Sequence, residues 1–223
     1  ELLPTVFHVA ARSVATNALS IFGDHSDVMS IRQSGFALLS EGTVQEVMDL
    51  SAVAHLATLE CSIPFVSFFD GFLTSHETQK INVLPSDDLK KLINQEALEI
   101  FQSRGMNPNH PSVSGTNQGP DLYFQQRETV NRNYQVVPFV VQKYMKKINE
   151  LQGTNYDLVT YYGHPEAQEV IIAMGSVSST IQQVVDYLMQ LGRRVGMLQV
   201  HLYRPFPVNC LLEKLPATVH SIA

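Results

Sequence analysis

The order of apolar runs between residues 35 and 69 constrains the fold more than any other feature of the sequence. The run at residues 35–40 is typical of a short buried strand, and helical periodicity follows over residues 44–62. A second β-prone run then occupies residues 65–69. Two strands joined through a helix form a parallel pair with the helix packed on one face, so the sequence predicts an α/β fold.

Similar runs extend this alternation to both ends of the chain. Thr43 and Glu46 have the spacing of a capping box, in which the hydroxyl and the carboxylate bind free N–H groups where a helix begins. A run that ends in Gly105 is typical of a helix closed by glycine. The other expected strands cover residues 5–11, 169–176 and 195–204, and the other expected helices cover residues 86–104, 138–151 and 178–191.

These runs predict two units, each with a parallel-rich sheet flanked by helices. We expect the first unit at residues 1–135, a boundary region at 136–164 and a second unit at 165–223. The segment at residues 106–132 contains Asn-Pro, His-Pro, Ser-Gly and Gly-Pro pairs, which indicate a long ordered connection with loop character.

Composition excludes several kinds of partner. The chain has 223 residues with a net charge of -6, and it has no long run of Lys or Arg, so nucleic-acid binding is not expected. No apolar stretch approaches the roughly 18 residues that cross a bilayer. Cys61 and Cys210 lie far apart without metal-ligand spacing, which indicates two buried thiols in a reducing, cytoplasmic environment. An iron–sulfur cluster takes about four thiolates, so this chain alone is not expected to hold one.

Polar side chains follow two of the expected strands. The loop at residues 70–77 comes after the strand at 65–69, and residues 23–27 follow the strand at 5–11. Ligands of open α/β sheets bind at the carboxyl ends of strands, so both loops could line one cleft. The same residues could equally form a turn at Asp70-Gly71 and cap the next element.

Three small patterns suggest chemistry without specifying it. Ser75 and His76 are adjacent, and neighbouring side chains of a regular strand or helix do not face each other, so we expect no catalytic pair there. Asp24, His25 and Asp27 are close in sequence but lack a defined metal-binding scaffold, and no metal is predicted. Gly175 before a helix start could bind phosphate, although close packing of strand and helix explains it better.

Several longer runs resemble one known family. The chain closely resembles pyruvate:ferredoxin (or flavodoxin) oxidoreductase over essentially its whole length and in the family's order. The matching runs are Phe22-Gly-Asp-His-Ser-Asp27, Arg32-Gln-Ser-Gly-Phe-Ala-Leu-Leu39, Val44-Gln-Glu-Val-Met-Asp-Leu50, Ala54-His-Leu-Ala57, Phe68-Phe-Asp-Gly-Phe72, Thr74-Ser-His-Glu77, Met106-Asn-Pro108, Tyr123-Phe-Gln125 and Tyr203-Arg-Pro-Phe206. The resemblance implies part of the pyrimidine-binding domain of a thiamine diphosphate enzyme, followed by a truncated domain like the C-terminal domain of transketolase.

The resemblance also implies an activity. Members of this family oxidatively decarboxylate pyruvate or a related 2-oxo acid with coenzyme A to acetyl-CoA, and pass electrons to ferredoxin or flavodoxin. They use thiamine diphosphate with Mg²⁺ and [4Fe-4S] clusters. We expect this chain to be a piece of such a protein, to work with the remaining domains of a homodimeric parent, and to hold none of these cofactors alone.

One position departs from the family. The family's run reads Phe-Phe-Asp-Gly-Phe-Arg-Thr-Ser-His-Glu, and the resemblance implies that its arginine holds the carboxylate of the 2-oxo acid. Leu73 stands at that position here, so this charge partner is missing. We expect Leu73 and Thr74 to face the substrate. The residues expected to line the cleft are Asp24, His25, Asp70, Gly71, His76 and Glu77.

Two hypotheses of different class follow. The chain is a piece of a working oxidoreductase, inactive by itself, whose substrate pocket is altered at Leu73. Alternatively, it is a catalytically retired module kept for folding or for contacts within another redox protein, such as a sulfite reductase flavoprotein. The persistence of Asp70, Gly71 and residues 74–77 beside Leu73 favours the enzyme.

Overall fold

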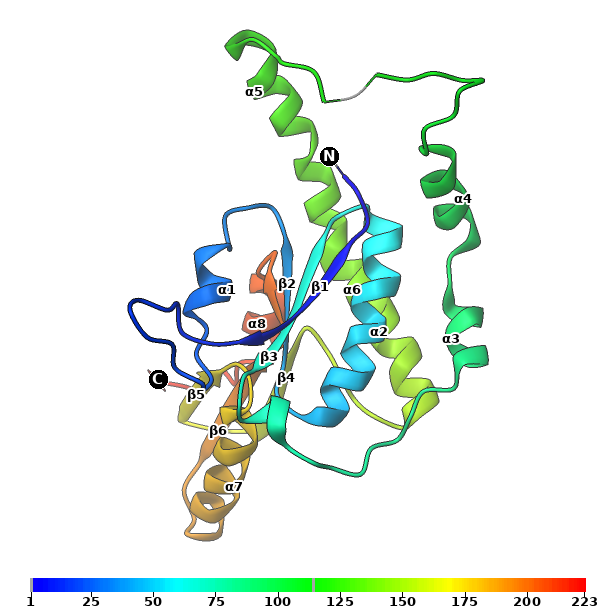
Figure 1. Ribbon diagram of the computed structural model, residues 1–223. Helices are drawn as coiled ribbons and strands as arrows, with labels where there is room; N and C mark the ends of the chain where they lie inside the picture. The colour runs from blue at the N-terminus through cyan, green and yellow to red at the C-terminus, as the bar shows by residue number, and fades with distance from the viewer. Residues whose placement is uncertain (1, 114) are drawn as a thin grey trace.

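The computed structural model describes residues 2–113 and 115–223, which form two four-stranded sheets flanked by helices (Figure 1). The strands are β1 (Val6–Ala11), β2 (Ala37–Glu41), β3 (Phe65–Asp70), β4 (Val159–Gly163), β5 (Glu169–Ala173), β6 (Val195–Val200), β7 (Leu202–Arg204) and β8 (Ser221–Ile222). The helices are α1 (Ser26–Ser30), α2 (Val44–Cys61), α3 (Ser86–Leu92), α4 (Gln95–Ser103), α5 (Pro120–Thr129), α6 (Asn131–Gln152), α7 (Val177–Gln190) and α8 (Val208–Lys214), and η1 (Thr74–His76) is a 3₁₀ turn.

Both sheets are rich in parallel pairs. The first has the order β1-β3-β2-β7, in which β3 pairs in parallel with β1 and β2, while β7 pairs antiparallel with β2. The second has the order β4-β6-β5-β8, in which β5 pairs in parallel with β6 and β8, and β4 runs antiparallel. The predicted fold class, an α/β fold with two parallel-rich sheets, is confirmed.

The prediction of a single strand at residues 195–204 is wrong, because this run supplies one strand to each sheet. β6 belongs to the second sheet and β7 to the first, and His201 lies between them. The His201 N–H donates to the carbonyl of Leu158 at 3.0 Å, and its carbonyl accepts from the Ser40 N–H at 2.7 Å. Strand propensity does not say which partner a strand pairs with, so the sequence alone could not reveal this crossing.

Residues 86–104 form two helices where one was expected. α3 ends at Leu92, the next residue, Ile93, has an extended backbone with a ψ of 126°, and α4 begins after Asn94. The Asn94 side chain accepts a hydrogen bond from the Ala97 N–H at 3.2 Å, which is the N-cap role that asparagine favours. An N-cap in the middle of an apolar pattern thus divides the helix.

The segment at residues 106–132 is not entirely a loop, contrary to expectation. Its Gly-Pro pair begins helix α5, with Pro120 at the first helical position, where a missing N–H costs nothing. α6 also begins earlier than expected, at Asn131, and accommodates Pro138 inside the helix. Figure 1 shows α5 projecting from the body, joined to α4 by a long connection.

The capping box at the start of α2 is partly formed. The Thr43 Oγ1 accepts from the Glu46 N–H at 3.1 Å, as expected. The Glu46 carboxylate instead accepts from the Gly42 N–H at 2.5 Å, one residue before the expected donor. Both contacts fix the turn that leads from β2 into α2.

The main hydrophobic core lies between the first sheet and the pair α2 and α6, while α1 covers the opposite face (Figure 1). Tyr144 of α6 is buried there, and its hydroxyl donates to Glu60 of α2 at 2.6 Å. The residues buried in this core are Ala37, Leu39, Leu50, Val53, Ala54, Leu56, Ala57, Cys61, Ile63, Phe65, Leu84, Val137, Val141, Tyr144, Met145, Ile148, Leu158 and Leu202. A smaller core forms under α1, and another lies in the second sheet.

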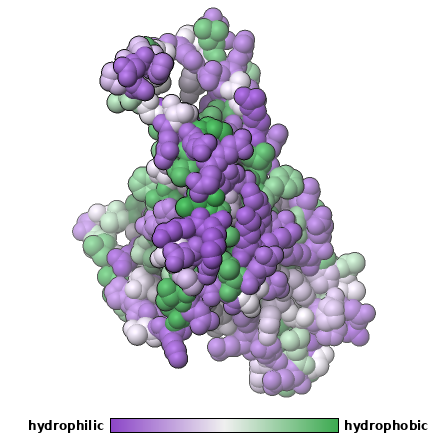
Figure 2. Space-filling view, turned by 90° about the vertical axis from the view of Figure 1, so that its right-hand side faces the viewer, coloured by the Kyte–Doolittle hydropathy of each residue, from purple (hydrophilic) through white to green (hydrophobic). Residues whose placement is uncertain are grey.

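The outer surface is mixed in character. In the space-filling view, hydrophilic side chains predominate and hydrophobic groups lie scattered among them (Figure 2). Within the part of the chain that the structure describes, no helix is both long and apolar enough to cross a membrane.

The core between α2 and α6 should dominate the stability of the first sheet. Leu50→Ala should lower the free energy of unfolding by about 2–5 kcal/mol, because Leu50 is fully buried and its truncation leaves a cavity. Leu122→Ala is the matched control, because Leu122 on α5 is 58% exposed, and it should change stability by less than about 0.5 kcal/mol. Urea unfolding measures both, and equal losses would contradict this description of the core.

Candidate functional site

The loops that follow β1 and β3 meet at the carboxyl end of the first sheet. Ala11 and Asp70 are opposite each other in the parallel pairing, so both strands end at the same level. A Cβ on Gly23 would lie 3.0 Å from the Asp70 Cβ, which shows how closely the loops approach. The rings of Phe22 and Phe72 pack edge-on, with centroids 5.0 Å apart. The structure therefore brings together the two loops that the sequence analysis singled out.

Asp70 and His25 form the centre of this contact. The His25 Nε2 lies 2.6 Å from Asp70 Oδ1, and the other carboxylate oxygen accepts the Ser176 N–H at 2.7 Å. Ser176 precedes α7, which packs against β6 and β4 of the second sheet. We refer to this sheet together with α7 as the second unit, and to the first sheet with α2 and α6 as the first unit. The carboxylate of Asp70 thus joins its own loop region to the second unit.

The charges of this pair stabilise each other. The hydrogen bond to Asp70 raises the pKa of His25 above its ordinary value, although burial opposes the change. Burial alone would raise the pKa of Asp70, but the hydrogen bonds from His25 and Ser176 lower it below its ordinary value. Both shifts favour an imidazolium paired with a carboxylate.

The start of α7 is filled by protein. Gly175 has a φ of +82°, and a Cβ there would lie 2.9 Å from Asp70 Oδ2 and 3.1 Å from the His25 ring. A Cβ on Gly42 would lie 2.7 Å from the Gly175 carbonyl oxygen. The Asp70 carboxylate therefore lies where an anion at this helix start would bind, and close packing explains Gly175 better than a phosphate site does.

The residues after Asp70 divide between buried and exposed positions. Thr74 is buried, and its hydroxyl donates to the Gly42 carbonyl at 3.0 Å. Leu73 is 54% exposed, and His76 and Glu77 are also exposed. The turn that presents these side chains begins at Phe72, whose φ of 65° is left-handed. The structure thus holds Thr74 inside the junction and leaves the other three on the surface.

Ser75 and His76 contact each other, although adjacent side chains of a regular strand or helix would not. That they form no catalytic pair stays a prediction. The Ser75 Oγ lies 2.9 Å from the His76 Nδ1, and it also accepts from the Phe72 N–H at 2.8 Å. This contact exists because the two residues lie in the single 3₁₀ turn η1, whose side chains do not follow the directions of a regular strand or helix. No acidic partner of His76 is recorded among the described residues, so the pair lacks the third group that orients a catalytic histidine.

The acidic residues of the first loop bind backbone groups. Asp24 Oδ1 accepts from the Ser26 N–H at 2.6 Å, and Asp27 Oδ2 accepts from the Arg12 N–H at 2.9 Å. Among the described residues, no group of three or more His, Cys, Asp or Glu side chains is placed to hold a metal ion. The loop acids therefore act on the loop's own conformation.

Arg12 is a cation at this site that the sequence analysis missed. It follows β1 directly, and its side chain lies so close to Gly71 that a Cβ there would meet the Arg12 Nε at 2.7 Å. The Nε is buried without a hydrogen-bond partner among the described residues. The signal was available, because the rule that directed attention to Asp70 applies equally to the first residue after β1.

The His25–Asp70 pair should give stability a specific pH dependence. The contribution of His25 is full below its ordinary pKa of 6.5 and is lost as pH rises through its raised pKa. The contribution of Asp70 is full above its ordinary pKa of 3.8 and is lost as pH falls through its lowered pKa. Asp70→Asn should therefore cost most between these values, about 1.5–3 kcal/mol for lost hydrogen bonds to a charged group.

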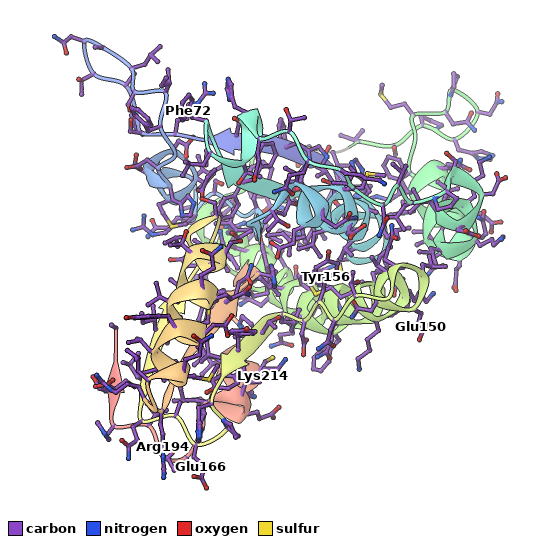
Figure 3. All side chains as sticks on the ribbon, turned by 90° about the horizontal axis from the view of Figure 1, so that it is seen from below. Phe72, Glu150, Tyr156, Glu166, Arg194 and Lys214 are labelled. Atoms are coloured by element: carbon purple, nitrogen blue, oxygen red, sulfur yellow. The ribbon has the colours of Figure 1, made fainter. Side chains whose placement is uncertain are left out.

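Unfolding monitored from acid to alkaline pH measures this cost. Glu166→Gln is the control, because Glu166 forms an exposed ion pair with Arg194 at 3.3 Å, far from Phe72 in the molecule (Figure 3). An Asp70→Asn cost that is the same at every pH would contradict the ionic character of the pair.

Comparison with known proteins gives this site a family context. Residues 1–146 match the family model described as pyruvate flavodoxin/ferredoxin oxidoreductase, thiamine diphosphate-binding, and residues 167–223 match that of pyruvate:ferredoxin oxidoreductase core domain II. A 2-oxoglutarate:ferredoxin oxidoreductase from Magnetococcus marinus has a similar fold, with a TM-score of 0.62 and 16% identity. The alignment covers 99% of this chain and 41% of that one.

Curated relatives share sequence over the whole chain. Pyruvate-flavodoxin oxidoreductase of Klebsiella pneumoniae is 55% identical, and pyruvate:ferredoxin oxidoreductase of Moorella thermoacetica is 52% identical, each over 223 residues. Pyruvate dehydrogenase [NADP(+)] of Cryptosporidium parvum is 48% identical. The chain spans 19% of the length of the first two relatives and 12% of the third. With more than half of its residues matched by the first family model, the chain belongs to the pyruvate flavodoxin/ferredoxin oxidoreductase family.

Proposed function

We propose that this chain is part of an enzyme that oxidatively decarboxylates pyruvate, or a related 2-oxo acid, with coenzyme A to acetyl-CoA. Electrons would pass to ferredoxin or flavodoxin. The observation that carries the proposal is the 55% identity of the whole chain to a pyruvate-flavodoxin oxidoreductase. A chain that covers 19% of such a relative is by itself one part of the catalytic unit.

The alternative of a catalytically retired module is not favoured. The three relatives named above are all oxidoreductases that act on pyruvate according to their names, and none is a sulfite reductase. The carboxyl end of the first sheet also keeps a dense polar arrangement around Asp70. Leu73 remains the single departure that prompted the alternative.

The start of α7 does not fit the diphosphate of thiamine diphosphate, and the described residues offer no site for its Mg²⁺. An anion at the start of α7 would meet the Asp70 carboxylate, and the described residues offer no metal-binding group. Cys61 and Cys210 are free thiols, and a [4Fe-4S] cluster takes about four. We therefore assign the diphosphate, the metal and the clusters to parts of the parent outside this chain.

For the substrate we propose that Arg12 supplies the cation. A planar guanidinium binds a planar carboxylate through two parallel hydrogen bonds. The Arg12 Nε is buried beside Gly71 without a partner among the described residues, so the group has donor capacity to spare. Leu73, at the position where the family has its arginine, is exposed at the edge of the same loop. A carboxylate at this edge therefore has a partner even though residue 73 is uncharged.

The proposal also covers the cellular compartment and the oligomeric state of the parent. Cys61 and Cys210 are both free thiols, but only Cys61 is buried as expected, while Cys210 is half-buried. Free thiols accord with the reducing cytoplasm that we propose for the parent. We propose a homodimeric parent in which this chain contacts the remaining domains, as the family resemblance implies. These assignments concern the parent as a whole.

Replacing Arg12 in the full-length parent tests the substrate assignment. Arg12→Gln should lower kcat/KM for pyruvate by about 10- to 100-fold, because a hydrogen bond to a charged group contributes about 1.5–3 kcal/mol. Arg194→Gln is the matched control, because Arg194 lies at the opposite end of the molecule from Phe72 and should leave kcat/KM unchanged (Figure 3). Steady-state kinetics with pyruvate measures both variants.

Leu73→Arg separates the two positions in the same assay. If the side chain at position 73 binds the substrate carboxylate, this change should raise pyruvate turnover by about tenfold or more, because it adds a contact to a charged group. A parent that already oxidises pyruvate and responds to Arg12→Gln but not to Leu73→Arg assigns the carboxylate to Arg12. A response to Leu73→Arg alone would contradict that assignment. No turnover by any form would support the retired module.

A further inference from the structure

A line of polar side chains crosses the interior between the first sheet and α2. Glu41, the last residue of β2, is hydrogen-bonded to the Ser67 hydroxyl on β3. The Ser67 Oγ lies 3.2 Å from the Nδ1 of His8 on β1, and the His8 Nε2 lies 3.0 Å from the Nε2 of His55 on α2. His8 and Ser67 are opposite each other in the parallel pairing, so their side chains share one face of the sheet.

This line leads from the deepest part of the interior to the surface. Glu41 and Ser67 are fully buried, whereas His8 and His55 are exposed. The Glu41 Oε2 has no hydrogen-bond partner among the described residues, so Ser67 is the polar side chain that links this carboxyl to water. A buried carboxyl held in this way is connected to solvent through one hydroxyl and one imidazole.

The surroundings disfavour a charge on Glu41. Burial raises the pKa of Glu41 well above its ordinary value against the effect of the Ser67 hydrogen bond, and the nearby Glu46 carboxylate raises it further. Glu46 is held by the Gly42 N–H and by Gln199 of β6, and His201 contacts the Ser40 carbonyl on the other side. Within the described part of the chain, no Lys or Arg side chain is hydrogen-bonded to the Glu41 carboxyl.

The histidine pair, in contrast, is suited to exchange protons at neutral pH. Although both residues reach the surface, neighbouring groups cover part of each ring. This partial desolvation lowers the pKa of His8, and the neighbouring His55 lowers it further. Burial also lowers the pKa of His55. Both rings are therefore neutral near pH 7, and a neutral imidazole can accept a proton at one nitrogen while it releases one from the other.

We propose that Ser67 and His8 form a proton relay that loads Glu41 with a proton from solvent and unloads it again. In the loading direction, His8 begins with its proton on Nδ1. Its Nε2 accepts a proton from water, directly or through the His55 ring 3.0 Å away, while Nδ1 releases its proton to Ser67 Oγ. Ser67 passes its own hydroxyl proton to Glu41 Oε1. One proton enters the line and one reaches the carboxylate. Ser67 and His8 both end neutral, with the proton of His8 moved from Nδ1 to Nε2, and the reverse transfer restores the starting tautomer.

The loaded carboxyl lies next to the junction of the two units. Gly42 follows Glu41 in sequence, its carbonyl accepts the Thr74 hydroxyl, and a Cβ on it would touch Gly175. Unloading places a second negative charge beside Glu46. The folded state raises the pKa of Glu41, so the protonated carboxyl is the form that the fold favours. Its contribution to the free energy of unfolding is full below the ordinary carboxyl pKa of 4.5 and is lost as pH rises through the raised pKa.

Infrared spectroscopy of this chain tests whether Glu41 is protonated at neutral pH. At neutral pH the wild type should show a carbonyl band of a protonated carboxyl that Glu41→Gln lacks. Glu41→Gln should also unfold at higher denaturant concentration than the wild type at alkaline pH, because the amide needs no proton. A wild type without such a band at neutral pH would overturn the proposal.

Rapid pH jumps followed at the same band test the route. Ser67→Ala should slow the response of Glu41 by about a hundredfold, the low end of what a positioned proton-transfer group contributes. Ser67→Thr keeps the hydroxyl and should retain the wild-type rate, which a merely structural role for Ser67 would not predict. Equal rates in wild type and Ser67→Ala would overturn the relay.

Exposed histidines provide a second pair of variants that does not depend on the fully buried Ser67. His8→Phe should slow the response as Ser67→Ala does, because it removes the nitrogen next to Ser67. His55→Phe is the matched control: it leaves His8 in contact with Ser67 and with solvent, and should leave the rate within about twofold of wild type on the same scale. A His8→Phe variant that responds as fast as His55→Phe would overturn the assignment.

Discussion

The Asp70 carboxylate, shared between His25 and the Ser176 N–H, is the interaction on which the arrangement of the two units depends. Its two oxygens bind groups from different parts of the chain, at 2.6 Å and 2.7 Å. A charge at this depth is favourable because both oxygens are satisfied and because the start of a helix attracts an anion. The same carboxylate excludes an external anion from α7, which explains why a loop with polar residues typical of a binding site is first a structural joint.

The backbone makes a second connection between the units. The chain leaves β6 in the second sheet and enters β7 in the first within one residue, His201, so the sheets share a continuous run. Gln199 of β6 donates to Glu46 at 3.2 Å, beside Gly42 and Gly175. The loops that follow β1 and β3 therefore meet the start of α7, through the hydrogen bond from the Ser176 N–H to Asp70. The buried Glu41 lies next to this joint.

Local patterns predicted much of the fold and less of the site. The alternation of strand and helix at residues 35–69 and the Thr43 cap depend on neighbours in sequence, and both appear in the structure. The division at His201 and the bond from Asp70 to Ser176 depend on partners more than a hundred residues away, which no local period encodes. Arg12 could have been predicted, because it directly follows a strand and ligands of α/β sheets bind at the carboxyl ends of strands. The contact of Ser75 with His76 was missed because a 3₁₀ turn was treated as regular structure.

Amide hydrogen exchange at Ser176 tests the central claim most directly, because this N–H is the donor through which the second unit binds Asp70. In Asp70→Ala the Ser176 N–H should exchange much faster than in the wild type. The Gly71 N–H, which donates to the Ala11 carbonyl at 2.9 Å within the first unit, should remain protected. Unchanged protection of Ser176 in Asp70→Ala would contradict the view that this carboxylate joins the two units.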